Sequence, residues 1–117
     1  MIWTGYFARI KDYPADLKPI AVSLYQPAFV RSMRVGKIAE LTPSKDLLQG
    51  YKDKTISEEE YITIFRQQLS KLNPDEYGEK LQDCILLCYE GYNKFCHRHL
   101  IAEWLRDNGY ECHEYAI

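Results

Sequence analysis

The fold of this chain is decided by Cys84-Ile85-Leu86-Leu87-Cys88-Tyr89, a run without a charged residue. A short continuous apolar run is typical of a central strand that is covered on both faces of a sheet. After the loop 90–95, a helix is predicted over Cys96–Asp107, because its apolar residues recur at helical spacing, at Leu100, Ile101, Trp104 and Leu105. Asn108-Gly109 is a typical helix stop, and Tyr110–Tyr115 then predicts a final strand.

A strand, a helix and a second strand at this spacing form a βαβ unit, so we expect the two strands to be parallel and their crossover right-handed. Two earlier strands are predicted, over Ile2–Arg9 and over Pro19–Tyr25, where β-branched and aromatic residues are frequent. The stretch Ala28–Glu40 has no clean period, and we expect it to be mostly loop.

Helices are predicted for the middle of the chain. Their starts carry capping residues, at Ser44, at Ser57 with Glu60 as a capping box, and at Asn73 before Pro74. The helices are expected to run through Tyr51, as far as Leu72 and over Asp75–Gln82 respectively. The whole chain, residues 1–117, is therefore predicted to be one small α/β domain, a mostly parallel sheet with helices on both faces.

Composition excludes several classes of protein. The 117 residues are 46% hydrophobic and 27% charged, which excludes a disordered chain and allows one core. A net charge of −2 does not indicate binding to nucleic acid through bulk basicity. We find neither a signal peptide nor a membrane span, so we expect a cytoplasmic protein with reduced thiols at its four cysteines. The oligomeric state is not predicted.

The strongest candidate site lies where Cys88 and Glu90 end the central strand and Cys96-His97-Arg98 begins the following helix. In open parallel sheets the binding crevice forms at the carboxyl ends of the strands, where helix N-termini point. Arg98 and the helix N-terminus would bind an anion such as phosphate. Cys96 or His97 would act as nucleophile or base, and Glu90 would orient groups or transfer protons.

Further candidates to line the crevice come from the ends of the two earlier strands and from the first helix. They are Tyr6 and Arg9, Ser23 and Gln26, and Lys52 as a second cation. No cofactor is indicated, because Gly-rich phosphate loops, an HExxH pair and a G-x-S-x-G elbow are all absent. The spacing of Cys88 and Cys96 from Arg98 does not build the anion loop of a cysteine phosphatase.

Two alternatives remain open at this point. In the first, the cluster is structural: Cys96 caps the helix, His97 faces the core, Arg98 is a solvated charge, and the ten tyrosines contribute to a surface that binds a protein partner. In the second, Cys88, Cys96 and His97 bind zinc with Cys112 or His113 of an adjacent strand, although no Cys-x-x-Cys pair occurs.

Several motifs resemble the bacterial domain-of-unknown-function family 488. They are Leu41-Thr42-Pro43-Ser44-Lys45-Asp46-Leu47-Leu48, Tyr51-Lys52, Glu59-Glu60-Tyr61, Leu86-Leu87-Cys88-Tyr89-Glu90 and Phe95-Cys96-His97-Arg98. The resemblance spans nearly the whole chain and implies an α/β domain of uncharacterised activity, with its motif on the cluster chosen above. We therefore expect an enzyme or ligand-binding domain with a site for a small anionic, phosphate-like or nucleotide-like compound.

Overall fold

The computed structural model describes residues 1–91 and 94–116. Within them the chain forms a sheet in the order β3-β2-β4-β1-β5, in which every paired neighbour is parallel. The strands are β1 (Ile2–Tyr6), β2 (Lys18–Ala21), β3 (Gly36–Lys37), β4 (Cys84–Cys88) and β5 (Cys112–Glu114). The predicted α/β class with a parallel sheet is confirmed.

The apolar run 84–88 is the central strand that its composition predicted. All residues of β4 are buried, and Leu86 pairs with Ile20 of β2 on one side and with Thr4 of β1 on the other. The strand β5 is parallel to β4, as expected of a βαβ unit, but β1 lies between the two. The zinc alternative placed Cys112 on a strand adjacent to β4, and this placement is wrong.

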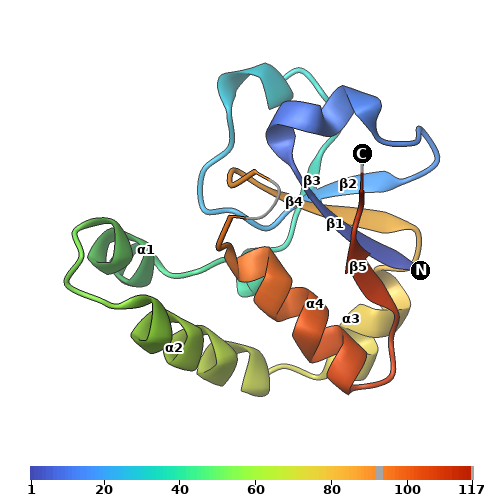
Figure 1. Ribbon diagram of the computed structural model, residues 1–117. Coiled ribbons are helices and arrows are strands. Elements are labelled where there is room, and N and C mark those ends of the chain that lie inside the picture. Colours follow the sequence, from blue (N-terminus) through green and yellow to red (C-terminus); the bar gives the residue numbers. More distant parts are fainter. Residues whose placement is uncertain (92–93, 117) are drawn as a thin grey trace.

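The two faces of the sheet are covered differently (Figure 1). The α-helices α1 (Lys45–Lys52), α2 (Glu58–Ser70), α3 (Pro74–Lys80) and α4 (His97–Asp107) pack on one face, where the larger core forms. The other face is covered by the 3-10 segments Phe7–Asp12 and Ala28–Val30 around a smaller core. Helices thus lie on both faces, but those on this face are short 3-10 helices and not α-helices. None of the helices in the described part of the chain is long and apolar enough to cross a membrane.

Local capping signals in the sequence are found at the helix starts. The Ser44 hydroxyl accepts from the Leu47 amide at 3.1 Å, and Ser57 and Glu60 form both hydrogen bonds of a capping box. Asn73 caps α3 ahead of Pro74. These bonds satisfy amides that have no partner within the helix, which is why short polar motifs predicted the starts well.

Strand ends were predicted less well. β1 stops at Tyr6 instead of Arg9, because the Tyr6 amide donates to the Tyr13 hydroxyl at 3.0 Å and the chain turns into a 3-10 helix. β2 stops at Ala21 instead of continuing to Tyr25, and the turn beyond it is closed by a hydrogen bond from the Ser23 hydroxyl to the Tyr25 carbonyl. The expected loop 28–40 contains two 3-10 turns and the short β3.

A buried ion pair joins α4 to β5. The Arg98 side chain is fully buried, and its Nε and Nη2 donate to the two carboxylate oxygens of Glu114 at 3.0 and 2.8 Å. The Thr4 hydroxyl of β1 donates to the same carboxylate at 2.6 Å. Burial raises the pKa of Glu114, but the hydrogen bonds from Arg98 and Thr4 and the charge of Arg98 outweigh it, so this pKa lies below its usual range.

Replacing Glu114 by Gln should lower the free energy of unfolding by about 3 kcal/mol at pH 7, because it leaves a buried guanidinium without its counter-charge. Urea denaturation measures this loss. The matched control is Arg66→Gln, which breaks the exposed pair that Arg66 forms with Glu103 at 2.8 Å. This control should cost less than about 1 kcal/mol. Equal losses in the two variants would contradict a structural role for the buried pair.

Candidate functional site

A pocket of about 380 Å³ opens at the carboxyl ends of β2 and β4. It lies between the segments that follow these strands, the first turn of α4, and residues of α1 and α2. Its lining combines aromatic rings with a few polar groups and two sulfur atoms, from Ser23, Leu24, Tyr25, Pro43, Leu48, Tyr51, Lys52, Tyr61, Cys88, Tyr89, Glu90, Phe95, Cys96 and His97.

The structure divides the candidate residues into two groups. Those that line the pocket are Cys96, His97, Glu90, Cys88, Ser23 and Lys52, and those that do not are Arg98, Tyr6, Arg9 and Gln26. Arg9 and Gln26 lie beyond the observed strand ends, and Arg9 instead pairs with Asp12 at 3.3 Å. Tyr6 lies with its ring 5.7 Å from the Arg98 guanidinium carbon, so it packs against that buried charge.

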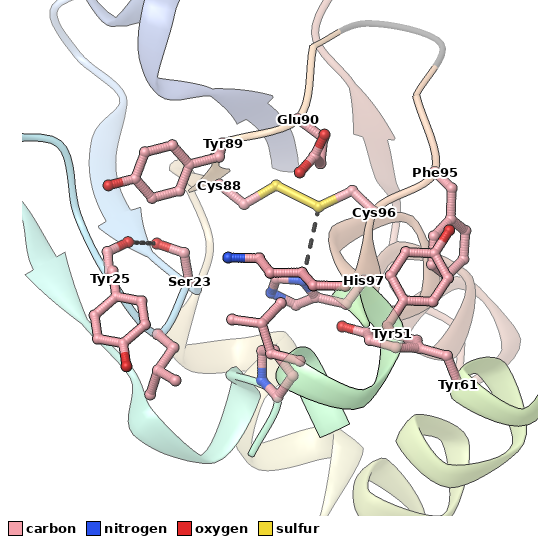
Figure 2. A pocket seen from close by; sticks show the side chains of 14 residues that line it. Ser23, Tyr25, Tyr51, Tyr61, Cys88, Tyr89, Glu90, Phe95, Cys96 and His97 are labelled. Atoms are coloured by element: carbon pink, nitrogen blue, oxygen red, sulfur yellow. Dashed lines mark hydrogen bonds between the residues drawn. A yellow bond between two sulfur atoms is a disulfide. The ribbon is translucent and has the colours of Figure 1, made fainter. Parts of the chain in front are cut away.

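An aromatic wall was not predicted as part of the site. Tyr51, Tyr61 and Phe95 contact one another with ring centroids 5.3 to 5.5 Å apart, and they stand on one side of the pocket (Figure 2). Burial raises the pKa of Tyr61, so its hydroxyl stays protonated at neutral pH. Each of the three residues occurs in a motif that resembles the family, and this was the only feature of the sequence that pointed to a place in the site. Their spacing in the sequence gave no hint that they meet.

Cys88 and Cys96 correct the expectation of four reduced thiols. Their sulfur atoms are joined as a disulfide, with Cα atoms 7.7 Å apart, while Cys84 and Cys112 are free and buried (Figure 2). The two partners meet because Cys88 ends β4 and Cys96 is the N-cap of α4, across a short loop. In the cytosol, disulfides that stabilise a whole domain are rare, whereas a transient disulfide between two cysteines of a catalytic or redox-sensing site does form there.

His97 is fixed in one orientation below this sulfur pair. Its Nε2 contacts the Val22 carbonyl oxygen, and its Nδ1 lies 3.6 Å from the Cys96 sulfur. A carbonyl oxygen only accepts, so Nε2 carries the proton and the Nδ1 lone pair faces Cys96. Burial lowers the pKa of His97 to about 4, and the hydrogen bond to Val22 opposes this shift only in part. The imidazole is therefore neutral at pH 7.

Arg98 does not occupy the ligand-binding position proposed from the sequence. Besides its two bonds to Glu114, it donates to the carbonyls of Glu90 and Gly91 at 2.6 and 3.1 Å and, through Nη1, to the Cys88 sulfur at 2.9 Å. A guanidinium has five N–H donors, so all of them have partners within the chain. Arg98 thus holds the loop after β4 and places its charge behind Cys88, instead of binding a ligand itself.

The zinc alternative lacks a ligand set in the described part of the chain. Residues 1–91 and 94–116 contain no group of three or more His, Cys, Asp or Glu side chains placed to hold a metal ion. Cys112 is fully buried on β5, and His113 pairs with Glu111 at 2.6 Å. Cys88, Cys96 and His97 do meet in the pocket, but neither Cys112 nor His113 joins them as a further ligand.

The burial of His97 predicts that the stability of the protein depends on pH. The pKa of His97 is 6.5 in the unfolded chain and about 4 in the folded chain. The contribution of the neutral His97 to the free energy of unfolding is therefore complete above pH 6.5 and is lost as the pH falls from 6.5 to 4. His97→Gln should remove this component, which is on the order of 3 kcal/mol at about 1.4 kcal/mol for each pKa unit. Urea denaturation between pH 7 and pH 4 measures it. Parallel pH profiles of both proteins would contradict a buried, neutral His97.

The chain matches a protein-family model. The model DUF488-N3a, described as the active DUF488-N3 subclade, matches residues 9–109. No curated protein and no solved structure matches the chain. The matched region covers most of the chain and includes every pocket-lining residue. The chain therefore belongs to domain-of-unknown-function family 488, as its motifs predicted.

Proposed function

We propose that this pocket is the active site of an enzyme that acts on a small anionic, nucleotide-like compound through Cys96 as nucleophile and His97 as its general base. The observation that carries the proposal is the fixed imidazole, whose Nδ1 lies 3.6 Å from the Cys96 sulfur while Nε2 is held by Val22. A nucleophile, a base in reach of it and a third group that orients the base are the parts of a covalent catalyst. The word active in the description of the matching model agrees with it.

The chemistry begins with the Cys96–Cys88 bond reduced, and the proposed setting is the cytoplasm, where thiols are kept in that state. His97 takes the Cys96 proton on Nδ1 as the sulfur attacks an electrophilic centre of the ligand. The Nε2–H bond to the Val22 carbonyl keeps the imidazolium in place. The same Nδ1–H then protonates the leaving group, so that the proton is returned within one cycle.

The ligand class follows from the walls of the pocket. Tyr51, Tyr61 and Phe95 offer an apolar, aromatic surface on which a planar ring packs. Lys52 lines the same pocket and supplies a cation for an acidic group, the role that the buried Arg98 does not fill. Glu90 lines the pocket beside the sulfur pair (Figure 2), and in this proposal its carboxylate accepts a hydrogen bond from the ligand.

A second candidate function is a non-catalytic interaction module. It is favoured by one observation, the exposed aromatic side chains of Tyr25, Phe29 and Tyr89, of which Tyr25 and Tyr89 line the pocket. In this alternative the aromatic residues bind a partner protein and the Cys-His-Arg cluster only supports the loop. It predicts that neither cysteine of the pocket has unusual reactivity, so the next experiment separates the two functions.

Alkylation of the reduced protein by iodoacetamide, mapped by mass spectrometry, tests the nucleophile. We expect Cys96 to react at pH 6 to 7, and His97→Gln to slow this reaction about tenfold because the proton acceptor is gone. Cys112 is the internal control, since burial raises the pKa of its thiol to about 12. A Cys96 that reacts no faster than Cys112, or that ignores the loss of His97, would favour the interaction module.

Binding of nucleoside monophosphates, measured by thermal shift and calorimetry, tests the ligand class. Lys52→Gln should weaken binding about tenfold, the effect of losing one charge-assisted hydrogen bond of roughly 1.4 kcal/mol. Lys45→Gln is the matched control, because Lys45 is exposed at the other end of α1 and does not line the pocket. Equal binding by both variants, or no binding by the unmodified protein, would contradict an anionic ligand held by Lys52.

A further inference from the structure

We infer that Cys88 and Cys96 act as a pair, and that the substrate is a small disulfide which the pair reduces to two thiols. This inference rests on the proposed function, because it uses Cys96 and His97 in the roles given there and adds the class of electrophile. Its starting point is that the two sulfur atoms form one bond on the wall of the pocket. Attack on carbon or phosphorus would leave both cysteines as thiols when the reaction ends, whereas attack on sulfur, followed by a second attack, leaves them joined.

The contact of Arg98 with Cys88 supports a role for Cys88 in the reaction. Four of its five N–H groups are held by Glu114 and by the Glu90 and Gly91 carbonyls, and the remaining one, on Nη1, is directed at the Cys88 sulfur at 2.9 Å. A fixed positive charge at hydrogen-bond distance stabilises a thiolate over a thiol. In the reduced protein Cys88 is therefore the sulfur that carries negative charge, while Cys96 keeps its proton until His97 accepts it.

The two sulfurs are thus prepared for different steps. Thiol–disulfide exchange needs a first thiol that attacks the substrate and a second that attacks the mixed disulfide. His97 serves Cys96 as a base, whereas the charge of Arg98 keeps Cys88 as a thiolate, so that Cys88 needs no base. The inference depends on both contacts together, that of His97 with the Cys96 sulfur and that of Arg98 with the Cys88 sulfur.

The substrate is a small molecule. Cys88 is 1% exposed and Cys96 is 4% exposed, so both sulfurs are reached through the pocket and not from the protein surface. A disulfide within a folded protein cannot enter a space of about 380 Å³ with its surrounding chain. The aromatic wall and Lys52 favour a disulfide that carries an aromatic, acidic group.

The reaction balances as follows. The Cys96 sulfur attacks one sulfur of the substrate as its proton passes to His97, the substrate S–S bond breaks, and the leaving thiolate takes that proton from His97. The Cys88 thiolate then attacks the Cys96 sulfur, releasing the second substrate thiolate, which is protonated by solvent. The substrate gains two electrons, the cysteine pair loses two, and a cellular dithiol restores the pair by exchange.

The probe for the test is dithiobis(nitrobenzoate), an aromatic and anionic disulfide that releases a coloured thiolate. The full chain is reduced, freed of reductant and mixed with one equivalent of the probe. We expect two thiolates for each probe molecule consumed, and a Cys88–Cys96 linked peptide without an attached nitrobenzoate in the mass spectrum. Cys88→Ser should release one thiolate for each probe and keep the other half bound to Cys96.

The outcomes separate the inference from the proposed function. Rapid, His97-dependent modification of Cys96 that stays as a mixed disulfide in the unmodified protein would overturn the paired chemistry and leave the nucleophile intact. Modification of Cys96 no faster than that of Cys112 would overturn both. In Cys96→Ser, Cys88 should be alkylated at pH 6 at least half as fast as at pH 8, and a tenfold or greater rise between these values would contradict a thiolate held by Arg98.

Discussion

A buried guanidinium needs a partner for each of its N–H groups, and Arg98 finds these partners on β5, at the end of β4 and in the loop that follows β4. Glu114 also accepts a hydrogen bond from Thr4 of β1, so the ion pair of Arg98 and Glu114 connects α4 with the strands β1, β4 and β5. Removing either charge would leave the other buried without compensation. The position of the α4 N-terminus, and with it the position of Cys96 and His97, depends on this contact.

The contacts of Arg98 also explain the position of the site at the carboxyl ends of β2 and β4. The Arg98 guanidinium contacts the Cys88 sulfur, the neutral imidazole of His97 faces Cys96, and Arg98 is not among the residues that line the pocket. A charge that is fully bonded inside the protein does not compete for a ligand anion, so it acts on the sulfur instead. Arg98 is thus a positioning residue, while the groups proposed to contact a ligand are Cys96, Lys52 and the aromatic wall, which line the pocket.

Local signals predicted much of the fold. The apolar run of β4 and the caps at Ser57 and Asn73 each depend on residues close together in the chain. The ends of β1 and β2 depend on contacts outside the strand, such as that of Tyr6 with Tyr13, and were missed. The burial of Arg98 depends on β5 lying next to β1, a long-range pairing that periodicity does not reveal, and arginine is rarely buried without such a partner. The cluster at residues 88–98 was found, but the roles within it required the structure.

The central claim is that His97 is a neutral base whose Nδ1 lone pair faces Cys96. Nitrogen NMR of the imidazole in the reduced protein measures this directly, because protonated and unprotonated ring nitrogens differ strongly in chemical shift. The account predicts a proton on Nε2, none on Nδ1, and no change between pH 5 and pH 8, since the pKa of His97 is about 4. A proton on Nδ1, or an imidazolium that titrates near pH 6.5, would contradict it.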